Sequence, residues 1–223
     1  MVSNADYEKI ANLSGDFPVK LIPTSTKSKL PMVFFISGDG GWNKFNILMC
    51  ETFSEKGMPV VWLNSQKYFW NAKTPEETTL EVSKAITRYL QVCEKEKFIL
   101  VGYSFGACVA PFVVDRLPGA LKESLNGIYC LSPDKTGDFE IHLSDMMSFG
   151  ASKGAYNVVE GMKKIKSFHP VCFFGDKEST DLTKIFSEAG AKITILPGDH
   201  HYNGNASGVA EAIINEVENI KKK

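Results

Sequence analysis

The chain has 223 residues, of which 43% are hydrophobic and 23% charged, so it can bury one sizeable core and we expect a single domain over residues 1–223. A formal net charge of −1 excludes the positive charge that bulk nucleic-acid binding needs, and no nucleic acid is expected as a partner. No apolar run approaches the roughly 18 residues of a membrane-spanning helix. The first residues lack a charged segment followed by an apolar one, so we expect no signal peptide. The expected location is therefore the cytoplasm or, if a signal peptide has been trimmed from the chain, the periplasm.

Short apolar runs recur along the chain and predict β-strands at residues 19–22, 32–36, 59–63, 97–103, 127–132, 170–174 and 192–196. Most of these runs are continuous and do not alternate with polar residues. Continuous runs are typical of parallel strands that are covered on both faces. The sequence therefore predicts a mostly parallel sheet.

Helical patterns fill the intervals between the predicted strands. Thr74-Pro75-Glu76-Glu77 has the form of a capping box with proline at the first helical position, so a helix is expected to begin there. Further amphipathic or apolar helical stretches are expected at residues 46–56, 107–116, 182–189 and 209–220. The repeated alternation of strand and helix predicts an α/β fold, a doubly wound sheet with helices on both faces and no large lid domain.

One segment, residues 133–166, has no clear periodicity and is rich in glycine, alanine and serine. Irregular segments of this length in compact domains are usually functional. It falls between two predicted strands, so we expect an insertion near the active site. Glu140 and His142 within it are candidates to line the same cleft, and a solvated surface hairpin is the alternative.

The sequence Gly102-Tyr103-Ser104-Phe105-Gly106 follows an apolar run and precedes a helical one. A nucleophile elbow needs this arrangement, because a serine on a sharp strand-to-helix turn requires small residues two positions before and after it. A helix N-terminus behind the serine also favours developing negative charge. We therefore predict that Ser104 is a nucleophile and not a hydroxyl in an ordinary turn.

A serine nucleophile needs a general base, which in this fold class comes last in the chain order Ser, acid, His. His200 and His201 lie after the last predicted strand and before the last helix, where the base is expected. Related hydrolases commonly have the spacing P-G-x-x-H in this loop. That spacing selects His201 as the base and leaves His200 as a neighbour of the site.

The triad acid is expected after the penultimate strand, where the sequence offers Asp176, Glu178 and Asp181. The common hydrolase pattern G-x-x-D, counted from Gly175, selects Glu178, which would orient the base and stabilise the imidazolium. The other two have ordinary interpretations, Asp176 as a turn residue and Asp181 as a helix N-cap.

Two backbone N–H groups are expected to form the oxyanion hole. One belongs to Phe105, directly after the nucleophile. The other belongs to Asp39, with Gly40 next, in the glycine-rich loop that follows an early strand. A carboxylate at Asp39 would suit a cationic group on the substrate, such as an amine.

Several segments together resemble the VirJ/AcvB family of bacterial virulence-associated proteins: SGDGGWN (37–43), NSQKYFWNAKTPEE (64–77), LVGYSFGACVAPF (100–112) followed by RLP, and PGDHHYNG (197–204). DFEIHLSD (138–145) is similar to another segment of that family. GYSFG alone is generic, whereas the pairing of SGDGGW with YFW and TPE is specific. The resemblance runs from about Met32 to about Gly204, which is most of the chain.

The resemblance implies an α/β-hydrolase fold, export to the periplasm and serine hydrolase chemistry on aminoacylated phosphatidylglycerol, such as the lysyl form. It also implies a link to virulence and secretion systems. Peripheral contact with membrane lipid is a further expectation for a protein with a lipid-like or aminoacyl-ester substrate. Matched to the family's motif, Ser104 is the nucleophile and His201 the base. The chain departs from the family in having Cys108 where an acidic residue is usual, and in lacking a cysteine after the acid-bearing loop that could pair with Cys172.

The substrate is expected to contact residues at the carboxyl ends of the strands: Asp39, Gly40, Trp42, Tyr68, Phe69, Trp70, Tyr103 and His200. For the aromatic stretch 68–70 the composition alone favours core packing, and its position makes it a candidate wall of an acyl or lipid site.

Two other functions fit the sequence. One is a non-catalytic binding protein of an envelope or secretion complex, because fold does not fix function. The other is an acyl esterase, thioesterase or peptidase that has the same triad and a different substrate.

No metal-binding or dinucleotide motif is present, so no metal or cofactor is expected. The five cysteines include no C-x-x-C pair and are expected to be buried thiols.

Overall fold

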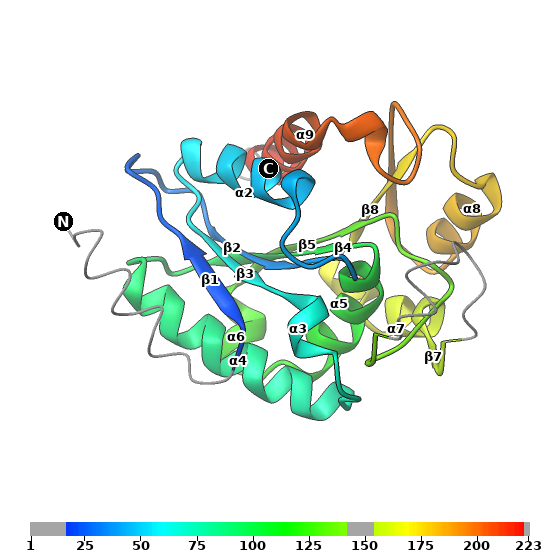
Figure 1. Cartoon of the computed structure of the whole chain (residues 1–223), viewed down its shortest axis with the longest axis horizontal. Helices are drawn as coiled ribbons and strands as arrows, with labels where there is room; N and C mark the ends of the chain where they lie inside the picture. Colours follow the sequence, from blue (N-terminus) through cyan, green and yellow to red (C-terminus); the bar gives the residue numbers. More distant parts are fainter. Residues whose placement is uncertain (1–16, 142–153, 221–223) are drawn as a thin grey trace.

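A computed structural model describes residues 17–141 and 154–220 (Figure 1). The main sheet contains β1 Val19–Ile22, β2 Met32–Ile36, β3 Val60–Leu63, β4 Phe98–Tyr103, β5 Leu125–Leu131, β8 Val171–Gly175 and β9 Lys192–Leu196. The helices are α2 Lys44–Glu55, α3 Ser65–Tyr68, α4 Pro75–Val92, α5 Phe105–Arg116, α6 Gly119–Ser124, α7 Val158–Lys164, α8 Thr180–Glu188 and α9 Ala206–Ile220, with 3-10 turns at Lys166–Phe168 and Tyr202–Gly204.

The main sheet has the strand order β1-β3-β2-β4-β5-β8-β9. Only β1 is antiparallel to its neighbour, and every other pairing in this sheet is parallel. The predicted α/β class and mostly parallel sheet are therefore confirmed. Each predicted strand is found within one or two residues of its expected bounds.

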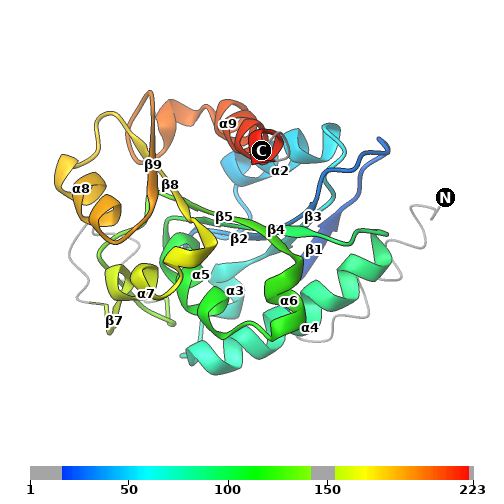
Figure 2. The same cartoon turned by 180° about the vertical axis from the view of Figure 1, so that it is seen from behind.

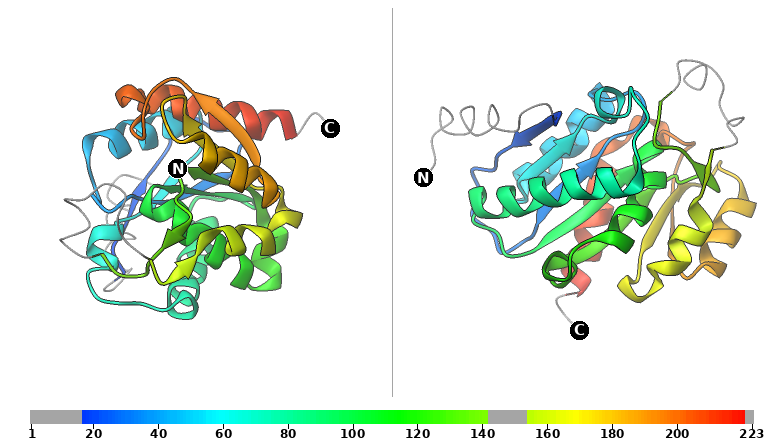
Figure 3. Two further views of the ribbon diagram at one scale, coloured as in Figure 1. Left: turned by 90° about the vertical axis from the view of Figure 1, so that its right-hand side faces the viewer. Right: turned by 90° about the horizontal axis from the view of Figure 1, so that it is seen from below.

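Helices cover both faces of the sheet, as Figures 1 and 2 show. Helices α2 and α9 pack together on one face, and α4, α5 and α7 lie side by side across the other (Figure 3). Successive residues of a strand point to opposite faces. In β4, Phe98 and Leu100 accordingly join the core beneath α4 and α5, while Ile99 and Val101 join the core beneath α2 and α9. This double burial explains why the strand is apolar throughout.

The capping box at the start of α4 is present as predicted. The Thr74 hydroxyl accepts a hydrogen bond from the Glu77 backbone, and the Glu77 carboxylate accepts one from the Thr74 N–H. Three short helices, α3, α6 and α7, were not expected. Each is seven residues or fewer, so it completes too few turns to give a readable periodicity.

The expected insertion, residues 133–166, is partly described by the structure. Thr136–Gly137 (β6) pairs antiparallel with Tyr156–Asn157 (β7), and α7 follows directly. Residues 142–153, which include the candidate His142, lie outside the described residues. Glu140 is half-buried, and the backbone on both sides of it is hydrogen bonded to residues 69 and 73.

Candidate active site

Ser104 lies between β4 and α5 at the carboxyl edge of the sheet, on a strained turn with φ 51° and ψ −112°. Such a φ is uncommon for a non-glycine residue and persists only where the surroundings hold it. A Cβ atom at Gly102 would lie 2.4 Å from the Gly106 carbonyl oxygen, and one at Gly106 would lie 2.1 Å from the Ile36 carbonyl oxygen. Both glycines are therefore required for this turn to close against the end of β2.

The glycine-rich loop after β2 lies beside the serine. A Cβ atom built on Gly38 would be 3.5 Å from the Ser104 Cβ. Asp39 is half-buried as a residue, and its Oδ1 accepts a hydrogen bond from the Gly40 N–H at 2.8 Å. Phe105 opens helix α5, so its N–H is one of the amides that a helix leaves without an intrahelical partner. The structure thus brings the expected oxyanion loop and the expected helix N-terminus to the same serine.

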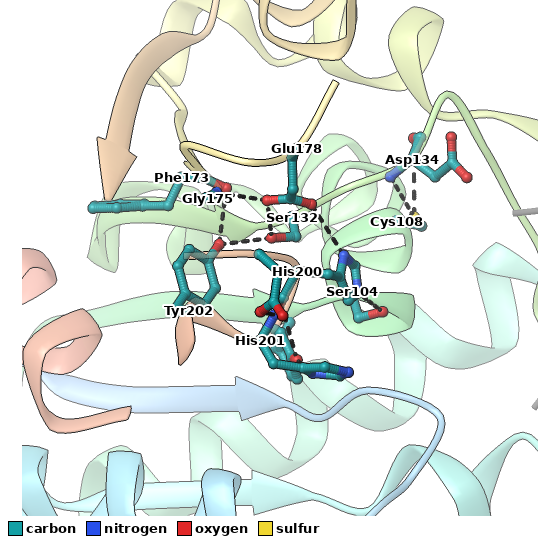
Figure 4. A network of polar contacts seen from close by, with 12 residues as sticks. Ser104, Cys108, Ser132, Asp134, Phe173, Gly175, Glu178, His200, His201 and Tyr202 are labelled. Atoms are coloured by element: carbon teal, nitrogen blue, oxygen red, sulfur yellow. Dashed lines mark hydrogen bonds and ion pairs between the residues drawn. The ribbon is translucent and has the colours of Figure 1, made fainter. Parts of the chain in front are cut away.

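His200 is hydrogen bonded to Ser104 and to Glu178 (Figure 4). Its Nε2 lies 2.9 Å from Ser104 Oγ, and its Nδ1 lies 3.1 Å from Glu178 Oε1. An ionised carboxylate can only accept, so the ring donates from Nδ1 and its Nε2 accepts the serine proton. This is the tautomer that a general base needs.

The choice of His201 as the partner of Ser104 is wrong, because the structure places His200 there. His201 is exposed, and its Nδ1 lies 2.6 Å from the Tyr103 hydroxyl. The loop turns at Gly198, where φ is +122°, and the Asp199 carboxylate then accepts a hydrogen bond from the His201 N–H. The two imidazole rings consequently diverge, with 80° between their planes.

Glu178 was selected from the three candidate acids, and it is the one that faces His200. Its Oε2 accepts hydrogen bonds from the Gly175 N–H at 2.6 Å and the Ser132 hydroxyl at 2.8 Å. Burial by itself raises the pKa of Glu178, but these two bonds and the one from His200 outweigh burial and lower that pKa. The carboxylate is therefore held ionised.

The two other acids have structural positions. Asp176 accepts a hydrogen bond from the Gly198 N–H at 2.9 Å and so ties the acid loop to the histidine loop. Asp181 was expected to be an N-cap, but Ser179 caps α8 and Asp181 lies in its first turn.

Tyr103 lies beneath both histidines and is almost fully buried. Besides the contact with His201, its hydroxyl donates to the His200 carbonyl oxygen at 3.3 Å. Burial, followed by the nearby carboxylates of Asp39, Glu178 and Asp199, raises the pKa of Tyr103. The phenol stays protonated, and it supports the loop more than it offers a surface to a substrate.

The aromatic stretch 68–70 divides between core and surface. Phe69 is 0% exposed and packs on Phe105, with 5.0 Å between ring centroids. Tyr68 is also buried, and its hydroxyl is hydrogen bonded to the Glu81 carboxylate. The structure therefore places both residues in the core, with 7% of Tyr68 and none of Phe69 exposed, and not at the surface where a substrate was expected to contact them. Trp70, by contrast, is 52% exposed. Trp42, which follows the Asp39 loop, is exposed as well.

One further side chain contacts the acid and a second contacts the first, and neither was anticipated. Ser132 directly follows β5, and its hydroxyl bonds both Glu178 and Tyr202. The only signal in the sequence is position, because Ser132 directly follows a buried strand as Ser37 does.

The described residues contain no group of three or more His, Cys, Asp or Glu side chains that could hold a metal ion. None of the described helices is long and apolar enough to cross a membrane. The cysteines are free thiols, and all but the half-buried Cys93 are buried.

A surface hollow at the opposite edge of the sheet is lined in part by Lys95. The Lys95 ammonium donates to the carbonyl oxygens of Ser28, Leu30 and Gly57, so it joins the two loops that precede β2 and β3.

The architecture and the geometry around Ser104 are those of the α/β-hydrolase fold. Similar solved structures include Est1E from Butyrivibrio proteoclasticus with bound ferulic acid (TM-score 0.64, 13% identity, 92% of this chain and 96% of that chain). Others are proline iminopeptidase from Mycobacterium smegmatis (TM-score 0.63, 9% identity, 91% and 94%) and MenH from S. aureus (TM-score 0.61, 10% identity, 91% and 98%). At these identities the likeness establishes the fold alone.

The family model for bacterial virulence protein (VirJ) matches residues 31–221. The chain therefore belongs to the VirJ family, and the resemblance noted in the sequence is confirmed. No curated protein matches the chain at a significant level.

Proposed function

We propose that the protein is a serine hydrolase that cleaves an ester bond. The observation that carries this proposal is the continuous hydrogen-bonded arrangement of Ser104, His200 and Glu178, in which Nε2 lies 2.9 Å from the serine oxygen. A non-catalytic binding protein would not need a base within hydrogen-bonding distance of a strained serine.

In the proposed reaction, Ser104 Oγ attacks the ester carbonyl carbon while its proton passes to His200 Nε2. Glu178 stabilises the resulting imidazolium across the 3.1 Å contact. The backbone N–H groups of Phe105 and Asp39 would bind the oxyanion of the tetrahedral intermediate. His200 then gives its proton to the leaving alcohol. In the second half, His200 takes a proton from water as the water oxygen attacks the acyl-enzyme, and returns it to Ser104 Oγ as the carboxylic acid leaves.

The proposed substrate is an aminoacylated phospholipid of the lysyl-phosphatidylglycerol type. Asp39 supports this choice, because this half-buried residue lies in the loop beside Ser104 and its carboxylate would attract a substrate amine. Asp39→Asn should lower kcat/KM for amine-bearing esters by about five-fold, as expected for a partly exposed ion pair. A neutral ester of the same length is the matched control, and an equal loss on it would contradict this role for Asp39.

Peripheral contact with membrane lipid and a periplasmic location are parts of the same proposal, with the cytoplasm as the alternative location. The exposed side chains of Trp42, Ile47, Leu48 and Trp70 support lipid contact, since tryptophan and aliphatic side chains favour the membrane interface. Cosedimentation with phosphatidylglycerol vesicles, reduced in Trp42→Ala, would test the contact. Cell fractionation would test the location.

The first experiment is covalent labelling by a fluorophosphonate probe. Wild type should label, Ser104→Ala and His200→Ala should not, and His201→Ala is the matched control that should still label. A folded wild-type protein that fails to label would contradict hydrolysis and favour the binding-protein alternative. A generic acyl esterase or thioesterase would label equally, and comparison of neutral, amine-bearing and thioester substrates separates it from the proposed activity.

A further inference from the structure

Two buried hydroxyl groups lie on the side of Glu178 that faces away from His200 (Figure 4). Ser132 is 3% exposed and Tyr202 is 1% exposed. The Ser132 hydroxyl donates to Glu178 Oε2 at 2.8 Å. The Tyr202 oxygen lies 2.8 Å from Ser132 Oγ and 3.0 Å from the Phe173 carbonyl oxygen.

The number of hydroxyl protons determines which group donates in each of these hydrogen bonds. Each hydroxyl has one proton, and the ionised Glu178 can only accept. The Ser132 proton is therefore committed to Glu178. The contact between the two hydroxyls then requires the Tyr202 proton, which is shared between Ser132 Oγ and the Phe173 carbonyl oxygen. Tyr202 thus donates to both the Phe173 carbonyl oxygen and Ser132 Oγ, Ser132 donates to Glu178, and successive bonds in such a chain polarise one another.

The hydrogen bonds on Oε2 also fix how the carboxylate faces the histidine. Rotation about the last bond of Glu178 would exchange its two oxygens. Ser132 and the Gly175 N–H both hold Oε2, at 2.8 and 2.6 Å, and this leaves Oε1 for His200. Without Ser132, a single backbone amide would have to hold that orientation.

The backbone is strained at both hydroxyl residues. Ser132 has φ 50° and Tyr202 has φ 52°, similar to φ 51° at Ser104. Few non-glycine residues adopt this region, and a bulky one such as tyrosine does so least readily. Strain of this kind is concentrated at functional sites, where neighbouring structure holds it. Here the Ser132 N–H donates to Phe173 and the Tyr202 N–H donates to Asp199, which holds both residues in place.

We infer that Ser132 is a positioning residue that holds Glu178 in register with His200, and that Tyr202 orients the Ser132 hydroxyl. This inference rests on the proposed serine hydrolase function. Neither residue would touch the substrate, because both lie behind the acid.

The test compares Ser132→Ala and Tyr202→Phe with wild type on a p-nitrophenyl ester between about pH 5 and about pH 9. Loss of a donor raises the pKa of Glu178, so kcat of Ser132→Ala should fall about ten-fold and most steeply at acid pH, with KM within about two-fold. Tyr202→Phe should show a smaller loss of the same form. Thr79→Val is the matched control, since it removes a buried hydroxyl that donates to the Pro75 carbonyl oxygen within α4, away from the acid.

A second readout does not depend on turnover. The His200 Nδ1–H proton should give a strongly deshielded NMR signal in wild type, assigned by its loss in His200→Asn, and Ser132→Ala should broaden or remove it. Retention of that signal in folded Ser132→Ala, or a loss of kcat equal at every pH, would overturn the inference. If wild type does not label with fluorophosphonate, the proposed hydrolysis fails, and this signal still decides whether Ser132 holds Glu178.

Discussion

Glu178→Gln is the sharpest single test of the proposed mechanism. The amide has nearly the same shape as the carboxylate, but it is neutral and cannot stabilise an imidazolium. The charges would be 3.1 Å apart, which at an effective dielectric constant of about 20 corresponds to about 5 kcal/mol. The His200 side chain is 33% exposed and the Glu178 side chain 10%, so solvent screens part of this energy and a loss of about 4 kcal/mol is the better expectation. We therefore expect kcat to fall about 10³-fold.

The assay is steady-state hydrolysis of a p-nitrophenyl ester, with active-site labelling to count competent molecules. Asp181→Asn is the matched control, because Asp181 is exposed in the first turn of α8 and does not contact the histidine. The reasoning would be refuted if Glu178→Gln kept more than about a tenth of wild-type kcat. It would also be refuted if Asp181→Asn lost as much activity.

Three further predictions concern stability. Gly106→Ala should destabilise the fold by about 3 kcal/mol or more, because a Cβ atom there meets a backbone carbonyl at 2.1 Å. Gly119→Ala should be neutral or stabilising, because nothing lies within 4 Å of a Cβ atom at that position. Urea denaturation of both variants measures the difference, and equal effects would contradict the argument. Phe69→Ala should cost about 3–5 kcal/mol because it leaves a cavity in the core, while Trp70→Ala should change stability by less than about 0.5 kcal/mol, and thermal melts of both should rank them in that order. The pKa of Glu178 is lowered in the folded state from an ordinary value of 4.5. Its carboxylate therefore stabilises the fold above that value, and this contribution is lost as pH falls through the lowered pKa. The difference in unfolding free energy between wild type and Glu178→Gln should shrink below pH 4.5, and a difference that grows there would contradict the argument.

The candidate site is assembled from the ends of four strands and depends on close approaches of backbone. Ser104 follows β4, Ser132 follows β5, Glu178 follows β8 and His200 follows β9. A Cβ atom at Gly175 would lie 2.4 Å from the Gly198 carbonyl oxygen, so the acid and histidine loops pack with no space between them. Substitution of this glycine would separate the acid from the base even though neither residue had changed.

Local sequence was sufficient where the physical constraint is local. The continuous apolar strands, the capping box at Thr74 and the turn around Ser104 each depend on a few neighbouring residues, and all are found as predicted. Chain order together with the strand-to-helix context also identified the loops that carry Glu178 and His200. Family membership followed from short segments as well, chiefly the pairing of SGDGGW with YFW and TPE.

The remaining features depend on contacts between residues far apart in the chain. His200 and His201 are adjacent and chemically identical, and the turn at Gly198 together with the Asp199 hydrogen bond to the His201 N–H sets which ring meets Ser104. Phe69 and Trp70 are likewise adjacent and aromatic, yet one is buried against Phe105 and the other is exposed. Spacing in the sequence does not contain the direction in which a side chain points from a loop, because that direction follows from backbone dihedral angles that distant strands and glycines impose.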